Sequence, residues 1–149
     1  MDLGQQLRFI GTFSRNLDEK GRLTVPAKWR FRGDEAEVYL AVPNPAGFIT
    51  VLPPERTKEL EEKLRQISMT DTEGQEALST FLTMMHSFGC DKQGRINLSD
   101  ELMSHAGLKK EAVMVGAISS FNTYSPEKIG GLKPTDVASQ MKALSRFNL

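Results

Sequence analysis

An internal repeat at an offset of 73 residues restricts the possible folds of this chain more than any other feature. The segment 17–25, Leu-Asp-Glu-Lys-Gly-Arg-Leu-Thr-Val, aligns with the segment 90–98, Cys-Asp-Lys-Gln-Gly-Arg-Ile-Asn-Leu. At the same offset 48–51 aligns with 121–124, and a Pro-Glu pair follows each of them. Two landmarks in the same order indicate a tandem duplication with about 70 residues in each half. We therefore expect two copies of one unit, packed as a pseudo-symmetric pair.

A tight turn is predicted at the start of each repeated segment. Asp18 and Gly21 bound the first turn, because an Asp side chain bonds to the backbone ahead of it and Gly accepts a positive φ. Asp91 and Gly94 occupy the same places in the second half. The strand after the first turn alternates, so Leu23 is expected to face the core and its neighbours the opposite side.

A short helix is predicted after each of these strands. Pro26 opens the helix in the first half, and Ser99 caps the helix in the second. Gly33 and Gly107 are expected to end them. The remaining strands of the two units are predicted over 7–13, 37–42, 48–52, 112–116 and 121–124.

Three further helices are predicted from apolar residues at helical spacing. The first covers 55–67, the second begins at a capping-box pattern in 70–73, and the third follows Pro134. Their apolar stripes are Leu60, Leu64 and Ile67, then Leu78, Phe81, Leu82 and Met85, and finally Val137, Met141 and Leu144. We interpret the Met84-Met85 pair as core filler rather than as part of a cofactor site.

The distribution of charge qualifies what the composition suggests about partners. The chain has 149 residues and a formal net charge of zero, which by itself argues against a nucleic-acid-binding protein. Residues 1–32, however, hold seven Lys or Arg and three Asp or Glu, a balance of +4, so the remainder carries −4. Such asymmetry is typical of a nucleic-acid-facing surface, and chance clustering on a solvated face is the alternative.

The expected location of the protein is the cytoplasm. No apolar stretch approaches the length of a membrane span, and residues 1–10 lack the apolar core of a secretory signal. The single cysteine, Cys90, excludes an internal disulfide framework and fits a reducing compartment.

The repeated Asp-x-x-Gly-Arg motif with its alternating aliphatic residues resembles the MraZ family of bacterial transcription regulators. His-Ala-Gly-Leu at 105–108 and Val-Met-Val-Gly at 113–116 extend the resemblance, which covers the chain from about residue 8 to about residue 128. The chain departs from the family pattern at 74–80, where relatives usually carry basic residues.

The resemblance implies a fold that is mainly β with α, built from two pseudo-symmetric AbrB-like swapped-hairpin β-barrel units. The expected boundaries are 5–53 for the first repeat, 54–86 for a helical connector, 87–130 for the second repeat and 131–149 for a C-terminal helical tail. It also implies closed homo-oligomeric rings, association with the nucleoid, and binding to short direct repeats of double-stranded DNA upstream of the division and cell-wall gene cluster.

Arg22 is the residue that we expect to contact DNA. It follows a tight turn on a strand whose other face is apolar, and a guanidinium fits phosphate or guanine edges. Arg95 is its equivalent in the second half, where acidic residues lie near it in sequence. We expect Asp18 and Asp91 to fix the turns instead, because a carboxylate repels phosphate. The other predicted phosphate contacts are Arg8, Arg15, Lys20 and Lys28, whereas Arg30 and Arg32 fit ion pairs on a helix surface equally well.

An enzyme is the weaker interpretation, and no metal, cofactor or small-molecule substrate is expected. His86 and Cys90 are four residues apart and could face one metal only if one helix carried both. Asp91 and His105 are the other residues on which this interpretation rests, but one Cys and two His are too few for a closed structural zinc site without carboxylates. Cys90 aligns with Leu17, which indicates a buried apolar position.

The alternative from another class is an AbrB-like oligomeric scaffold or antitoxin-type module that binds protein. An exposed apolar groove would favour this alternative, whereas a basic surface repeated by assembly would favour DNA. Because single subunits are neutral, we expect useful affinity for DNA only from a ring that presents the same face several times.

Overall fold

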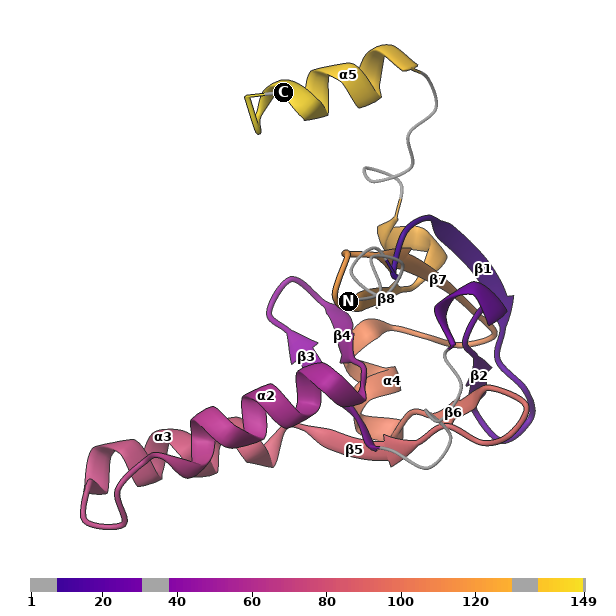
Figure 1. The fold of residues 1–149 in the computed structure, drawn as a ribbon. Coiled ribbons are helices and arrows are strands. Elements are labelled where there is room, and N and C mark those ends of the chain that lie inside the picture. Colours follow the sequence, from indigo (N-terminus) through magenta and orange to yellow (C-terminus); the bar gives the residue numbers. More distant parts are fainter. Residues whose placement is uncertain (1–7, 31–37, 130–136, 149) are drawn as a thin grey trace.

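A computed structural model describes residues 8–30, 38–129 and 137–148 of the chain (Figure 1). The strands are β1 (Thr12–Asn16), β2 (Arg22–Thr24), β3 (Val38–Asn44), β4 (Phe48–Leu52), β5 (His86–Gly89), β6 (Arg95–Asn97), β7 (Glu111–Gly116) and β8 (Phe121–Tyr124). The helices are α2 (Pro54–Arg65), α3 (Thr72–Thr83), α4 (Asp100–Ala106) and α5 (Val137–Ser145), with the 3-10 turns η1 (Ala27–Trp29) and η3 (Pro126–Lys128). No helix among these residues is long and apolar enough to cross a membrane.

The strands form two antiparallel sheets, so the fold is mixed α and β. The larger sheet has six strands in the order β1-β7-β8-β4-β3-β5, and β2 pairs with β6 in a separate two-stranded ribbon. The larger sheet ends at β1 on one side and at β5 on the other. Over the described ranges we therefore find open sheets and no closed β-barrel.

Strands pair between the two halves of the chain as well as within each half, where β3 pairs with β4 and β7 with β8. β1 of the first half pairs with β7 of the second, and β5 of the second half pairs with β3 of the first. The register follows the repeat: the pair of Phe13 with Met114 corresponds, at the offset of 73 residues, to the pair of His86 with Ala41. Consequently neither half holds a complete sheet of its own.

The main core lies between the β2–β6 ribbon and one face of the larger sheet. Leu23 and Ile96, the middle residues of the two ribbon strands, are both fully buried. Trp29 lies 5.5 Å from Phe9 and 5.1 Å from Phe121, measured between ring centroids, and joins the ribbon side of the core to the sheet. This packing turns the opposite face of the ribbon outward.

Local signals for α4 lead to the structure that the sequence predicts. The Ser99 side chain accepts a hydrogen bond from the backbone N–H of Leu102 at 3.2 Å. Gly107 follows the helix with a φ of +68°, the left-handed conformation that glycine adopts at least cost. Leu102 is buried, as is Trp29, its equivalent in the first half.

The start of α3 differs from the capping-box prediction. Asp71, rather than Thr70, is the capping residue, and its Oδ1 accepts from the backbone N–H of Gly74 at 3.0 Å. The hydroxyl of Thr70 lies 2.9 Å from that of Ser68 instead. Thr70 and Asp71 can both cap a helix. Thr70 pairs with Ser68 in the preceding turn, and Asp71 caps α3.

The ends of two other elements differ from those predicted from the sequence. β1 begins at Thr12 rather than at residue 7, because its pairing with β7 sets its extent, and only an isolated bridge at Phe9 precedes it. The short helix after Pro26 is a single 3-10 turn, with Arg30 already extended; its predicted end at Gly33 lies outside the described residues. Met84 is 57% exposed, so its assignment as core filler is wrong.

Candidate nucleic-acid interface

The β2–β6 ribbon presents its two arginines on one face. Arg22 lies opposite Asn97, and Arg95 lies opposite Thr24, in the antiparallel register. Paired residues in a sheet share a face, and residues two apart on a strand share it too. All four side chains therefore project away from the core.

A carboxylate holds the first turn and the first arginine together. Asp18 Oδ1 accepts from the backbone N–H of Lys20 at 2.9 Å and from that of Arg22 at 2.8 Å. Asp18 Oδ2 accepts from Arg22 Nε at 2.6 Å. Gly21 closes the turn with a φ of +74°, and its N–H donates to the Asp18 carbonyl at 2.9 Å.

The second turn repeats this geometry. Asp91 Oδ1 accepts from the backbone N–H of Gln93 at 2.9 Å and of Arg95 at 2.8 Å, and Oδ2 accepts from Arg95 Nε at 2.6 Å. Gly94 has a φ of +83°. Two segments 73 residues apart therefore orient a guanidinium in the same way.

Each ion pair fixes the direction of the arginine side chain, and the carboxylate compensates the charge of the guanidinium. The backbone N–H of Arg22 lowers the pKa of Asp18, and the guanidinium lowers it further. The backbone N–H of Arg95 and its guanidinium do the same for Asp91. Both carboxylates are thus ionised at neutral pH, so each pair is neutral overall. The arginine side chains remain 28% and 32% exposed, and no hydrogen bond involves their Nη groups among the described residues. What each pair offers a ligand is a pre-oriented donor edge.

Arg8 does not lie on this surface. Its side chain is 1% exposed, and Nη1 lies 3.1 Å from Glu55 Oε1. Its Nη2 donates to the Tyr39 hydroxyl at 3.2 Å, and its Nε donates to the Trp29 carbonyl at 2.5 Å. The predicted phosphate contact is therefore wrong for this residue, because a buried, paired cation cannot reach a phosphate without opening the core.

The other predicted cations differ in their exposure and in the contacts that they make. Lys20 and Lys28 are exposed. Arg15 is half-buried, its guanidinium lies 5.3 Å from the centre of the Phe13 ring, and Nη1 donates to the Ser14 carbonyl at 3.0 Å. Arg32 lies outside the described residues.

Arg30 contributes to the second turn, which sequence reasoning missed. Its guanidinium packs directly against the backbone of Gly94. Its Nε is buried, with no hydrogen-bond partner in the described part of the chain. The equivalent contact at the first turn is made by Met103, the residue 73 positions after Arg30, whose sulfur packs against Gly21. The repeat offset pairs these two residues, but only the exchange of halves brings each to the other half's turn.

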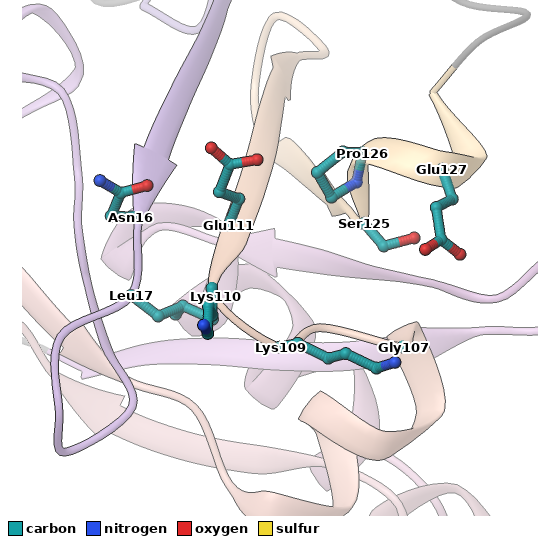
Figure 2. Close-up of a pocket in the computed structure, with 9 residues that line it drawn as sticks. All are labelled: Asn16, Leu17, Gly107, Lys109, Lys110, Glu111, Ser125, Pro126 and Glu127. Carbon is teal, nitrogen blue, oxygen red and sulfur yellow. The ribbon is translucent and has the colours of Figure 1, made fainter.

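Lys110 lies beside the first turn, a position that no sequence signal indicates. The N–H of Leu17 donates to the Lys110 carbonyl at 2.8 Å, one residue before Asp18. Lys109 and Lys110 line a cleft, and Figure 2 shows them with the other residues that line it. The cleft has a volume of about 670 Å³. The residues that line this cleft are Asn16, Leu17, Gly107, Lys109, Lys110, Glu111, Ser125, Pro126 and Glu127. Its two lysines are balanced by two glutamates, so the cleft has no net preference for an anion.

The residues of the enzyme alternative lie apart from this surface. Cys90 is buried, as its alignment with Leu17 indicates. His86 belongs to strand β5, so the condition that one helix carries it with Cys90 is not met. His105 Nε2 lies 2.7 Å from the Asn44 carbonyl oxygen. In the described ranges no three His, Cys, Asp or Glu side chains are grouped so as to hold a metal ion.

The fold and the two matched turns define a mixed α/β protein with two Asp–Arg turns of the same geometry. The family described as "MraZ protein, putative antitoxin-like" matches residues 81–129. A protein of Natranaerobius thermophilus named Transcriptional regulator MraZ is 37% identical over 120 residues, which are 80% of this chain and 82% of that protein. A protein of the same name from Lactobacillus gasseri is 35% identical over the same shares. A third, from Alkaliphilus metalliredigens, is 28% identical over 91% of this chain and 98% of its own. The chain belongs to the MraZ family.

Proposed function

We propose that the protein is a transcriptional regulator that binds double-stranded DNA with the outward face of the β2–β6 ribbon. The observation that carries the proposal is the pair of pre-oriented arginines, Arg22 and Arg95, on that face. An arginine held through Nε keeps its Nη edge for phosphate oxygens or for the O6 and N7 atoms of guanine. The names of the relatives support the regulatory role.

The cations around the two turns also favour the outward face of the ribbon as the DNA-binding surface. Lys20 is exposed on the first turn and Lys92 on the second. Because Arg30 packs on the second turn and Lys110 adjoins the first, each turn gains a cation from the other half. Phosphate contacts of this kind contribute affinity without sequence preference, whereas the arginines on the ribbon supply the preference.

We further propose that the two halves form a pseudo-symmetric swapped-hairpin pair and that copies of the chain assemble into a closed ring. The exchanged pairings of β1 with β7 and of β5 with β3 support the first part. A ring repeats one face in one sense, which suits direct repeats in a promoter, and the division and cell-wall gene cluster is the expected target. The expected site of action is therefore the nucleoid, and no catalytic role is proposed.

The test is a titration of promoter DNA with direct repeats, at fixed salt, using Arg22→Ala and Arg95→Ala. Each lost arginine contact is expected to weaken binding by about tenfold or more. Arg56→Ala is the matched control, because Arg56 is an exposed, ion-paired arginine on α2, away from the ribbon. Mass measurements check that all variants keep the assembly state of the parent.

Unchanged affinity of both ribbon variants would overturn the proposed interface. A loss in the Arg56→Ala control as large as that in Arg22→Ala would instead show that charge alone, rather than the ribbon face, governs binding.

One observation favours a second role in protein binding. An apolar groove lies between α2, α3 and the edge of the larger sheet. A scaffold or antitoxin-type module would use such a groove for another protein. Absence of DNA binding at low salt would favour this role over that of a regulator.

A further inference from the structure

The hairpin of α2 and α3 leaves an apolar groove open. Figure 1 shows the two helices extending together from the β3–β5 end of the larger sheet. The groove between them and that sheet edge has a volume of about 400 Å³. Its apolar lining consists of Val38, Leu40, Leu60, Leu64, Leu78, Leu82 and Met85. Leu82 is 49% exposed, and α3 buries none of its residues.

Helix α5 has an apolar face that no other described residue of the subunit covers. Every residue from 137 to 148 is exposed, and Figure 1 shows α5 clear of the sheet and of the other helices. Val137, Met141 and Leu144 follow one another at helical spacing and form a single stripe, with Met141 59% exposed. A helix of this length is marginal in water unless its apolar face is packed.

Charge distinguishes between the possible ways of covering these faces. Residues 54–85, which include α2 and α3, hold seven acidic and four basic side chains, a balance of −3. Residues 137–148 hold two basic side chains, Lys142 and Arg146, and no acidic one, a balance of +2. Two α2–α3 hairpins therefore repel each other, whereas α5 and the hairpin attract each other.

The position of the cation on α5 suits an apolar contact. At 100° per residue, Lys142 lies about 100° or more around the helix from Val137, Met141 and Leu144, and Arg146 follows the end of the helix at Ser145. The apolar stripe can thus enter the groove while the charges stay in water. The nine residues of α5 span about 13.5 Å, and the twelve of α3 span about 18 Å, so the helix fits within the length of the groove.

We propose that α5 of one subunit docks into the α2–α3 groove of a second copy of the chain. Each copy carries one groove and one helix, so the contact is head-to-tail, and a chain of such contacts closes into a ring when the rotation allows it. The proposal deepens the ring assembly of the proposed function and rests on it. It assigns the C-terminal helix and the helical connector, which the DNA-binding ribbon does not use, to assembly.

Cysteine cross-linking between two differently labelled copies tests the proposal. One full-length variant carries Leu82→Cys in the groove, and the other carries Met141→Cys on α5. The native Cys90 is buried and does not compete. We expect the mixture to give a disulfide-linked species of twice the 16.6 kDa chain mass under mild oxidation, and Lys142→Cys in place of Met141→Cys to give much less.

Three outcomes would overturn the proposal. A variant that carries both Leu82→Cys and Met141→Cys could cross-link within one chain while the mixture of single variants does not. That result would place α5 in the groove of its own subunit. Leu82→Cys alone could form the linked species, which would make the groove self-associating. No cross-link in any combination would mean that α5 does not occupy the groove.

Charge substitutions give an independent measurement. Met141→Glu and Leu82→Glu each put a carboxylate into the proposed contact, and both positions are exposed in the single subunit. Sedimentation should show the midpoint concentration of assembly raised by about tenfold or more in each. Lys142→Glu, outside the apolar stripe of α5, should change it less.

DNA binding separates a failure of this contact from a failure of the proposed function. If Met141→Glu keeps both the ring and the binding of promoter repeats, the contact is wrong and the regulator proposal stands. If Met141→Glu loses the ring and the unsubstituted protein, with its ring intact, does not bind DNA, the contact stands and the regulator proposal fails.

Discussion

Asp18 and Asp91 each do two things with one carboxylate: they close a turn and they aim an arginine. Three hydrogen bonds reach each carboxylate, two from backbone N–H groups and one from Nε of the arginine four residues on. The resulting pair carries no net charge. On the proposed DNA-binding surface, the pair would therefore contribute orientation, and with it sequence preference, rather than general attraction to phosphate.

Asp18→Asn should separate these two contributions. Removing the negative charge raises attraction to phosphate, but it releases the Arg22 guanidinium from its fixed direction. We expect affinity for scrambled DNA to rise and the ratio of promoter to scrambled affinity to fall by about tenfold, as measured by competition binding. Glu19→Gln is the control, because it removes the same charge from the same exposed turn. A fall of equal size in the control would refute a positioning role for Asp18.

The lowered pKa values of the two turn carboxylates give a pH dependence. The backbone N–H of Arg22 is the largest cause for Asp18, and that of Arg95 for Asp91. Because the folded-state pKa lies below the ordinary value of 3.8, the turn is fully stabilised above that value and loses its stabilisation as the pH falls through the lowered pKa. Carboxyl carbon NMR should give midpoints below 3.8 for both residues. A midpoint in the folded protein equal to that of an unfolded 17–25 peptide would contradict this.

At the scale of single elements, strand ends differ in how closely other backbone approaches them. Gly116 ends β7, where the chain returns past Phe9, and a Cβ at this position would overlap the Phe9 carbonyl. Gly89 ends β5, and a Cβ there would meet nothing within 4 Å. Close backbone therefore requires glycine at position 116, whereas the space around position 89 would accept a Cβ.

Gly116→Ala should accordingly destabilise the protein by about 2 kcal/mol or more, because backbone rather than a flexible side chain has to move. Gly89→Ala is the matched control and should change the free energy of unfolding by no more than about 0.5 kcal/mol. Urea unfolding followed by circular dichroism measures both. Equal effects in the two variants would show that the close approach at Phe9 is relieved elsewhere.

The start of α3 offers a second test at this scale. Asp71→Ala should lower the stability of the helix by about 1 kcal/mol, because it removes the acceptor for the Gly74 N–H. Thr70→Ala, which removes the side chain that the capping-box pattern selects, should have a smaller effect. Hydrogen exchange of the α3 amides distinguishes them, and the reverse order would restore the sequence-based assignment.

At the scale of the molecule, the charge asymmetry of the sequence is largely undone by the fold. The excess of +4 in residues 1–32 suggests a basic N-terminal end. In the structure Arg8 is neutralised inside the core by Glu55, and Arg30 lies against the second turn. Lys110, from the second half, adjoins the first turn. Both motif turns are therefore supplied with cations, and the two ends of the ribbon are more alike than the sequence suggests.

In the proposed ring, assembly would supply the affinity for DNA, since each Asp–Arg pair is neutral. We expect DNA with several direct repeats to bind at least about a hundredfold more tightly than DNA with one repeat, because the second contact is intramolecular. Titrations at equal total repeat concentration measure this ratio. DNA with altered spacing between the repeats serves as the control, because the proposed ring, if rigid, could not contact all of the displaced repeats at once. Equal affinities for all three DNAs would contradict multivalent binding.

Prediction from the sequence succeeded where the deciding contacts are close along the chain. The two Asp-to-Gly turns, the Ser99 cap and the Gly107 stop all depend on residues within a few positions of one another, and the strands 48–52 and 121–124 follow local alternation. It failed for Arg8, whose exposure depends on Glu55 and Tyr39, and for Arg30, which packs on the other half. Charge and position in the sequence carry no information about such distant neighbours.

The sequence by itself determined the duplicated unit, its order of elements and the paired Asp–Arg turns, because hydrogen bonds within five residues and alternation along a strand are local. Only the tertiary structure decided that β1 joins β7 and that β5 joins β3. An alternating strand offers the same N–H and C=O groups to either half, so local preference cannot choose its partner. Packing of both halves around one core makes that choice. It thereby brings Arg22 and Arg95 to the same face.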